Sequence, residues 1–447
     1  MKQHSLMKHL PVQVFALVLV VLATVSGRAS AAELNIEITR GVDNPIPIAV
    51  VPFNWQGDGS LDEDLAQVIA NNLEQVGEFR PLSRTNMLSM PSEEREVHYR
   101  DWRILAQQYL VVGKVDQVPG GQSVQVQWEF FDINRERKML GEVLTGSTTQ
   151  LRDIAHAISD VIYEEITGRR GAFSTKILYI SSEGSSQEDL LYRLHVSDYD
   201  GRRAQVLLES REPIMSPAWS PDGSQIAYVS FETDLPRIYI QNLTTGERRQ
   251  VTDFSGINSS PVWSPDSSHL AMVLSKDGSP DIYVLNLATD ELTRMTDHPR
   301  ADTEPSWTLD SSSVIFTSDR TGQPQIYMQD INAPGFPERL TFDCFYCAKG
   351  QFLPDGVNMV HVRRDTRQDR NYSIAILNTE TSRVITLTDT ALDESPSVAP
   401  NGSMIMYGTT ANGRGVLDAV SIDGRVKFRL PSAQGDVREP AWSPYLN

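Results

Sequence analysis

The groups in this 447-residue chain that could carry out chemistry are one Cys-x-x-Cys pair and a few histidines. The histidines after residue 32 are scattered and show no metal-ligand spacing; they are His98, His156, His195, His269, His298 and His361. No Gly-x-Ser-x-Gly, His-Glu-x-x-His or P-loop sequence occurs, so signatures of hydrolases, zinc proteases and nucleotide-binding proteins are missing. We therefore expect no catalytic residues, no metal ligands and no cofactor.

Two short motifs have structural interpretations. Cys344 and Cys347 lie between strand-like segments, whereas a redox-active thiolate favours a helix N-terminus, and two ligands cannot complete a zinc site. We expect either a local disulfide or two free thiols in a loop. Asp198-Tyr-Asp200-Gly201 resembles the start of a calcium loop but lacks the later acidic ligand, so we expect a hairpin turn.

The charge balance limits the classes of partner. The formal net charge is −18, and residues 1–32 contain Lys2, Lys8 and Arg28 but no acid, which leaves −21 on the remainder. Binding to nucleic acid or anionic lipid requires clustered Lys and Arg. The composition therefore argues against nucleic acid as a partner.

The N-terminal segment has the pattern of an export signal. Lys2 and Lys8 precede an apolar run from Val12 to Val25, and small residues follow up to Ala32. The run is about 14 residues long, shorter than the roughly 20 that span a bilayer. We predict a signal peptide over 1–32, cleaved after Ala32, and a mature chain without an integral membrane segment.

A repeat dominates the second part of the chain. The sequence Pro217-Ala-Trp-Ser-Pro-Asp-Gly223 recurs, and its third position falls at Trp219, Trp263, Trp307, Phe352, Val398 and Trp442, at intervals of 44, 44, 45, 46 and 44 residues. Short β-rich runs such as 225–230, 237–241 and 248–252 follow each copy. Four strands per repeat of about 44 residues match one β-propeller blade, so the repeats predict six blades.

The two ends of this region predict how the ring closes. The last repeat stops after its first strand, whereas three unassigned strand segments lie at 176–181, 191–196 and 204–208. We expect the C-terminal strand to complete the first blade of an all-β propeller over 176–447, which removes free sheet edges. The tryptophans expected to pack between blades are Trp219, Trp263, Trp307 and Trp442.

Residues 45–170 lack the repeat and predict a separate α/β domain. Ser60 and Glu63 form a capping-box pattern ahead of apolar residues at helical spacing. The other expected elements are strands at 46–53, 110–115, 124–133 and 142–149, helices at 101–108 and 154–166, and a linker at 168–175. The fold class is therefore two-domain, an N-terminal α/β domain followed by a six-bladed propeller closed by the C-terminal strand.

The extension at 33–44 alternates apolar and polar residues but also carries turn formers. It either docks on its own protein or adds a strand to another sheet, and the sequence leaves both possibilities open.

Connections that enter the innermost strand of each blade gather on one side of a propeller, around its channel. We call this side the channel face; its loops are 212–216, 257–260, 301–304, 345–349, 391–395 and 436–439. Many of their residues are acidic or small and polar, and loops on a rigid ring commonly carry function.

Several motifs, in order along both domains, resemble the TolB family, the periplasmic components of the Tol–Pal system. They are Val50-Val-Pro-Phe-Asn-Trp55, Ile166-Thr-Gly168 with Gly171-Ala-Phe173, Val196-Ser-Asp-Tyr-Asp-Gly201, Ser216-Pro-Ala-Trp-Ser-Pro-Asp-Gly223, Thr303-Glu-Pro305, Leu392-Asp-Glu-Ser-Pro-Ser397, Phe428-Arg-Leu-Pro431 and Pro440-Ala-Trp-Ser-Pro-Tyr-Leu446. The loop at 343–349 departs from the family pattern.

The resemblance implies a periplasmic adaptor that is not an enzyme and that supports outer-membrane invagination at division and outer-membrane integrity. Its implied partners are the lipoprotein Pal, the protein TolA and, further, other outer-membrane proteins. The implied Pal-binding residues are Ser259, Ser260, Thr303, Glu304, Asp393, Glu394 and Ser395. The implied TolA-binding segment is Glu33, Leu34, Asn35, Ile36, Glu37, Ile38, Thr39, Arg40, Gly41, Val42, Asp43 and Asn44.

Two alternatives stay open at this point. One is a periplasmic propeller that binds or hydrolyses a small ligand, because a channel can hold a carboxylate pair. The other is an outer-membrane assembly scaffold, although such propellers generally lack this N-terminal domain.

Overall fold

A computed structural model describes residues 36–38, 44–119, 123–184, 186, 189–333, 335–390, 392–431 and 435–446, with only the backbone at 36–38. The predicted signal peptide over 1–32, its cleavage after Ala32, and residues 33–35 and 39–43 of the extension lie outside these ranges. Within them, no helix has both the length and the apolar character needed to cross a membrane. Residues 35–447 form one compact unit.

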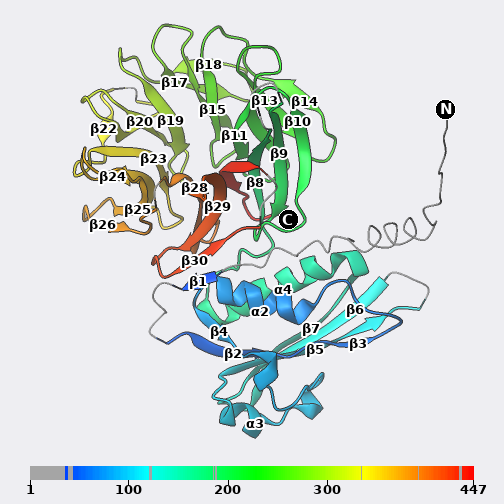
Figure 1. Ribbon diagram of the computed structural model, residues 1–447. Helices are drawn as coiled ribbons and strands as arrows, with labels where there is room; N and C mark the ends of the chain where they lie inside the picture. The colour runs from blue at the N-terminus through cyan, green and yellow to red at the C-terminus, as the bar shows by residue number, and fades with distance from the viewer. Residues whose placement is uncertain are drawn as a thin grey trace, which may run out of the picture. The chain divides into compact units, whose positions relative to one another are not determined.

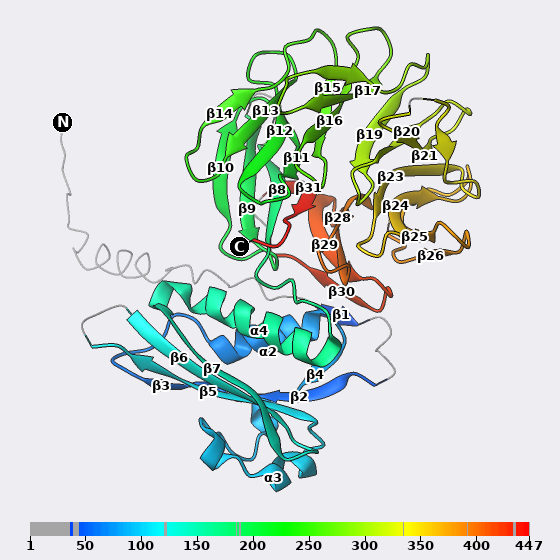
Figure 2. The same ribbon diagram turned by 180° about the vertical axis from the view of Figure 1, so that it is seen from behind.

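The α/β region is a mixed sheet with two helices side by side on one face (Figures 1 and 2). The strand order is β4-β2-β5-β6-β7, with β2 parallel to β4 and β5, and β3 also pairing with β5. The strands are β2 (Ile46–Val50), β3 (Asn54–Gln56), β4 (Phe79–Pro81), β5 (Tyr109–Gln117), β6 (Ser123–Asp132) and β7 (Arg137–Ser147). The helices are α2 (Leu65–Gln75), α3 (Tyr99–Ile104) and α4 (Leu151–Thr167), with 3-10 turns at Arg84–Asn86, Glu94–Glu96 and Thr148–Gln150.

Two local predictions in this region are wrong. Helix α2 begins after Asp64 rather than Ser60, because the Asp64 side chain accepts a hydrogen bond from the Gln67 amide at 3.0 Å and caps the helix. Helix α3 spans Tyr99–Ile104 instead of 101–108, and the chain turns at Ala106, whose φ is 54°.

The second region is the predicted six-bladed propeller, with four strands in each blade (Figures 1 and 2). Blade 1 combines β8 (Lys176–Glu183), β9 (Leu191–Asp198) and β10 (Gln205–Ser210) with the C-terminal strand β31 (Asp436–Trp442). Blades 2 and 3 are β11 (Ile214–Trp219), β12 (Gln225–Ser230), β13 (Arg237–Asn242) and β14 (Arg248–Gln250), then β15 (Asn258–Trp263), β16 (His269–Leu274), β17 (Asp281–Asn286) and β18 (Leu292–Arg294). Blades 4 and 5 are β19 (Asp302–Trp307), β20 (Ser313–Ser318), β21 (Gln325–Asp330) and β22 (Glu338–Arg339), then β23 (Tyr346–Phe352), β24 (Asn358–Arg364), β25 (Ser373–Asn378) and β26 (Val384–Thr386). Blade 6 is β27 (Glu394–Val398), β28 (Met404–Ala411), β29 (Arg414–Ser421) and β30 (Val426–Arg429).

The repeated tryptophans and aspartates explain why each blade forms. Trp263 packs in an apolar cluster with residues of blades 2 and 3, and Trp307 does the same for blades 3 and 4. The turn aspartate of blade 3, Asp266, accepts hydrogen bonds from Ser264 Oγ at 2.5 Å and from the Ser268 amide at 3.0 Å. These bonds hold the pKa of Asp266 at about 2, below its ordinary value, so the charged carboxylate stabilises the turn.

The N-terminal extension contributes a strand to the propeller. Strand β1 (Ile36–Ile38) pairs antiparallel with β30, with Ile36 opposite Phe428 and Ile38 opposite Val426. Blade 6 therefore carries a fifth strand at its outer edge (Figure 1). Of the two arrangements left open by the sequence, residues 36–38 of the extension have the one that docks on their own protein.

The two regions are joined by charged contacts at the Asp198–Gly201 turn between β9 and β10. Arg152 of α4 donates to Asp198 Oδ2 at 3.1 Å and to Asp200, while Lys176 Nζ donates to Asp198 Oδ1 at 2.6 Å. Arg203 also bonds to Asp198 and reaches Asp153 of α4. The turn predicted for this motif is therefore the contact that connects α4 to blade 1.

Buried bonds from Tyr199 complete this interdomain contact. The Tyr199 hydroxyl lies between Asn72 Oδ1 at 2.8 Å and Gln75 Oε1 at 2.6 Å, both on α2. Its ring packs on Trp442 of β31, with centroids 6.3 Å apart. One residue of the turn thus contacts both the α/β helices and the closing strand.

We expect Asp198→Asn to destabilise the protein by about 3 kcal/mol, because it takes the carboxylate away from buried Arg152 and from half-buried Lys176 and Arg203. Burial alone would raise the pKa of Asp198, but contacts with His156, Arg203 and Lys176 outweigh it and hold the pKa well below its usual range. This stabilisation is present above the unfolded pKa of about 3.9 and is lost as the pH falls below it. Urea denaturation at pH 7 and at a series of values from about pH 4 to about pH 2 measures both effects.

The matched control for this experiment is Asp253→Asn, which removes a carboxylate that pairs with Arg237 but is 82% exposed. Its expected cost is below about 1 kcal/mol. Equal losses for the two variants, or an unchanged acid dependence in Asp198→Asn, would contradict the role assigned to the buried contact.

We expect Trp442→Ala to lower the free energy of unfolding by about 3 to 5 kcal/mol. The ring is 7% exposed, and Trp442 Nε1 donates to Thr175 Oγ1 at 2.7 Å, so the substitution weakens the closing strand and leaves a cavity. Trp55→Ala, which alters a half-buried tryptophan of the α/β region, is the control. Guanidinium denaturation followed by circular dichroism measures the difference, and equal destabilisation would count against ring closure as the cause.

Candidate functional site

Each innermost strand carries a β-bulge at the same place, and the bulges form a ring around the channel. In all six blades the register with the second strand shifts by one residue at this point. The bulged residues have left-handed backbones with φ between 50° and 53°; they are Ser216, Ser260, Glu304, Lys349, Ser395 and Glu439. All but Lys349 precede a proline, which has no N–H to donate and is tolerated at a bulge.

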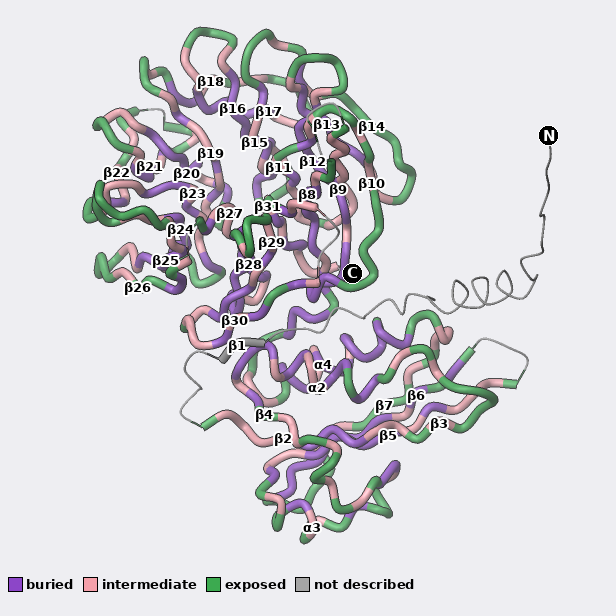
Figure 3. The backbone as a smooth tube through the Cα atoms, in the orientation of Figure 1, coloured by how far each residue is buried: buried purple, intermediate pink, exposed green. Residues whose placement is uncertain are grey.

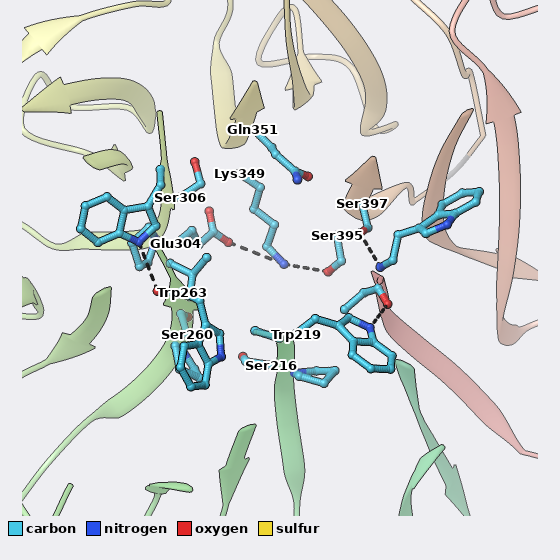
Figure 4. A pocket seen from close by; sticks show the side chains of 18 of the residues that line it. Ser216, Trp219, Ser260, Trp263, Glu304, Ser306, Lys349, Gln351, Ser395 and Ser397 are labelled. Atoms are coloured by element: carbon cyan, nitrogen blue, oxygen red, sulfur yellow. Dashed lines mark hydrogen bonds and ion pairs between the residues drawn. The ribbon is translucent and has the colours of Figure 1, made fainter. Parts of the chain in front are cut away.

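Below this ring the channel contains a cavity of about 430 Å³, lined by the bulged residues and by the repeated tryptophans (Figure 4). Trp219 Nε1 donates to Ala441 O at 3.0 Å and Trp307 Nε1 to Val262 O at 3.2 Å, so each ring is bonded to the preceding blade. Trp219, Trp263 and Trp307 pack in apolar clusters between neighbouring blades and also line the cavity. Trp442 lines the cavity as well, but its ring contacts are Thr175 and Tyr199.

The charged groups of the ring are engaged with neighbouring blades. Lys349 Nζ lies 3.8 Å from Glu304 Oε1 and donates to Ser395 Oγ at 2.8 Å (Figure 4). The carboxylate of Glu439 accepts a hydrogen bond from the Ser216 amide. Both channel glutamates thus bind the protein itself, which favours a structural role for the ring over a reacting carboxylate pair.

Three of the implied contact residues are ring members, and three lie one position ahead of a ring residue. Ser260, Glu304 and Ser395 line the cavity, and Ser259, Thr303 and Glu394 precede them in the chain. All six are half-buried. The structure thus brings together residues from blades 3, 4 and 6 at the channel face.

Asp393 differs from the other implied contact residues because its side chain is 0% exposed. Its carboxylate accepts hydrogen bonds from Thr409 Oγ1 at 2.7 Å and from Thr388 and Thr390. A partner on the surface cannot reach this group, so Asp393 holds the loop in place rather than presenting a contact. Asp393 lies two residues before the bulge of its blade, and the residue at this position is buried in every blade. These residues are Ile214, Asn258, Asp302, Cys347, Asp393 and Val437.

Exposed apolar side chains lie in loops of the channel face, and none of them is among the contact residues that the sequence implied. Met215 is 41% exposed, Ile257 42% and Leu392 43%, in the loops that lead into blades 2, 3 and 6. Large apolar side chains that are exposed on the same face as the implied contact residues are available to pack against another protein. The repeat alignment could have indicated Met215, since it occupies the same position as Ser259 and Thr303.

The Cys-x-x-Cys pair forms a disulfide between Cys344 and Cys347, the first of the two arrangements expected. Cys347 occupies the buried repeat position at the start of β23. The Gln325 side-chain amide donates to Cys344 O at 3.1 Å. The bridge thus fixes the loop that enters blade 5.

Three ligand-type side chains lie close together at the interdomain contact: His156, Asp198 and Asp200. Their potential ligand atoms lie within 4.8 Å of one another, but Arg152 and Lys176 already occupy the carboxylates. A cation would have to displace these side chains, so the charge balance of this cluster does not favour a metal.

Comparison with known proteins agrees with this architecture. The chain matches the family described as "TolB amino-terminal domain" over residues 34–139 and "TolB beta propeller domain" over 163–446. It is 54% identical over 432 residues to the Tol-Pal system protein TolB of Pseudomonas fluorescens strain Pf0-1, covering 96% of this chain and 98% of the relative. The Pseudomonas aeruginosa protein of the same name is 55% identical over 426 residues, covering 95% and 98%.

A solved structure shows the same fold along the chain. The crystal structure of TolB from Acinetobacter baumannii superimposes with a TM-score of 0.83 at 38% sequence identity, covering 92% of this chain and 100% of that one. With both regions matched in order, and with relatives this similar over nearly their full lengths, this chain belongs to the TolB family of Tol-Pal system proteins.

Proposed function

We propose that this protein is a periplasmic adaptor that binds Pal through the channel face and TolA through the N-terminal extension, and that it thereby supports outer-membrane invagination and integrity. The channel face is the observation that carries the proposal, because rigid bulges hold its polar residues beside exposed apolar ones. Membership of a named multiprotein system favours protein partners over a small substrate.

The opposite ends of the propeller strands have different neighbours. Contacts with the α/β region come from the β9–β10 turn, from Asn401, which donates to Arg170 O at 3.1 Å, and from Tyr445, whose ring lies 3.9 Å from the Arg170 guanidinium. These residues lie at the strand ends away from the channel face. The α/β region therefore leaves the proposed Pal-binding loops uncovered.

The extension is suited to exchange between its own protein and another sheet. Strand β1 contributes three residues paired with β30, which is a short interface. Strand addition supplies backbone hydrogen bonds to any exposed sheet edge, so the same segment can pair elsewhere. Release of residues 33–44 from β30 would present them to TolA.

A contact in the docked state connects the extension to the α/β helices. Val426 of β30 pairs with Ile38 and also packs against Gly77, just after α2, where an added Cβ would lie 2.1 Å from Val426 Cγ2. Helix α2 in turn bonds to Tyr199 of the interdomain turn. Docking of the extension and binding at the channel face are therefore proposed to be coupled, and such coupling is reciprocal.

We expect Thr303→Arg to weaken binding of the soluble domain of Pal by more than about tenfold, because it places a long cation at the channel mouth. Isothermal titration calorimetry of residues 33–447 measures the effect. Thr245→Arg is the control, since Thr245 is exposed in the β13–β14 turn at the other strand ends. If Thr303→Arg binds Pal like the unaltered protein, the assigned face is wrong; if the unaltered protein shows no binding, the adaptor function is lost.

Deletion of residues 33–44 is expected to abolish binding of TolA and to change the affinity for Pal by about 5- to 150-fold, the range typical of coupled sites. Calorimetry with each partner tests the two effects separately. Unchanged affinity for Pal would eliminate the coupling, while retained binding of TolA would eliminate the assignment of the extension.

A further inference from the structure

Blade 5 carries an arginine-rich loop in a protein whose net charge is −18. The end of β24 and the following loop read Arg363-Arg-Asp-Thr-Arg-Gln-Asp-Arg370, which holds four arginines and two aspartates. We call residues 363–370 the arginine loop. No contact described above uses it.

The arginine loop borders a cavity of about 360 Å³. Its walls are Arg363, Arg364, Asp365, Asp369, Arg370, Asn371, Ser373 and Thr386. A space of this size admits one or two side chains of a partner rather than a folded domain. Guanidinium, amide and hydroxyl donors on its walls suit an oxygen-rich group.

Two arginines of the loop are held in place. Arg364 lies over the rings of Phe345 and Tyr372, at 4.8 and 5.1 Å, and its Nε is buried without a hydrogen-bond partner. Arg363 donates to the backbone oxygen of Asp343, next to the Cys344–Cys347 disulfide. The disulfide therefore helps to position one wall of the cavity.

Two further arginines are available to a ligand. Arg367 and Arg370 are exposed and form no ion pair in the part of the chain that the structure describes. Both aspartates of the loop are exposed as well; Asp365 is paired with Arg363, and Asp369 accepts a hydrogen bond from the Thr366 amide at 2.7 Å. With four arginines and two aspartates, the loop as a whole carries a net positive charge.

The arginine loop lies on the channel face. Arg364 pairs with Tyr346 at the entry of innermost strand β23, so the β24–β25 connection emerges beside the loops that enter the channel. The cavity is consequently on the rim of the surface to which we assign Pal.

We propose that the arginine loop receives an acidic, carboxylate-bearing segment of the protein partner that docks on the channel face. The two aspartates in the cavity wall favour a singly charged carboxylate over a phosphate dianion, because like charges repel more strongly as the ligand charge rises. The arginine loop is also a basic site on a face with many acidic residues. Such a site fixes the orientation of the partner and raises the association rate at low salt. This inference rests on the proposed function.

The first test compares two charge reversals on the same face. Arg370 lines the cavity, whereas Arg211 is an exposed arginine before blade 2 on the same face, with no ion pair among the described residues. We expect Arg370→Glu to weaken binding of the soluble Pal domain by about tenfold at low salt and to flatten its salt dependence. Arg211→Glu should change the affinity less than about threefold.

The outcomes separate the inference from the proposed function. If Pal binds the unaltered protein and both variants alike, or if both charge reversals weaken binding equally, the arginine loop is not the site and the adaptor function stands. If Pal does not bind the unaltered protein, the adaptor function fails, and a second measurement decides on the loop.

That second measurement uses an acetylated tetraglutamate peptide, with tetraglutamine and inorganic phosphate as comparisons. Saturable binding of tetraglutamate that is lost in Arg370→Glu and retained in Arg211→Glu supports a carboxylate site, whichever protein supplies the segment. Binding of phosphate instead of tetraglutamate, or equal binding of the two peptides, overturns the inference.

Discussion

Pairing between the two ends of the propeller sequence is the constraint on which the rest of this structure depends. Strand β31 pairs antiparallel with β8, so residues 436–442 complete the blade that begins at residue 176. Without that pairing, blade 1 would lack its innermost strand and the ring of bulges would lack Glu439. An open ring would expose a sheet edge and the face of a blade to water, and closure of the ring avoids this exposure.

The same closure creates the junction between the two regions of the chain. Trp442, near the end of β31, packs on Tyr199, whose hydroxyl bonds to α2. Arg152 of α4 reaches the adjacent Asp198. Because these groups share a few buried contacts, the stability of the ring and the attachment of the α/β helices depend on the same residues. This arrangement leaves the strand ends at the channel face free for partners.

The channel face combines rigidity with varied chemistry. Six left-handed bulges fix its backbone, and serine, glutamate or lysine side chains occupy them. Lys349 connects Glu304 to Ser395 across three blades, so even the charged positions are held in place. The exposed residues around this frame, from Ile257 to the arginine loop, can therefore define a docking surface without large rearrangement. Figure 3 shows that exposed segments of the propeller lie mainly in the connections between its strands.

The amino-acid sequence by itself determined the repeat, the number of blades and most of the α/β elements, because each depends on spacing along the chain. It also predicted ring closure, because an incomplete repeat lies at each end of the propeller. It also placed the candidate contact residues in the loops that enter the channel. The wrong prediction that helix α2 is capped at Ser60 also has a local cause. Asp64 can cap the same helix, and its side chain is held in place by Arg84.

Only the tertiary structure decided which of those residues a partner can reach. Asp393 and Glu394 are neighbours in one acidic loop, yet one is enclosed by three threonines and the other is half-buried at the mouth. Burial depends on contacts with strands far away in the sequence, such as that of Thr409, and no local pattern reports them. The pairing of Ile36–Ile38 with β30 could not be predicted from the sequence either. A short alternating segment can pair with many sheet edges, and only the folded protein selects one of them.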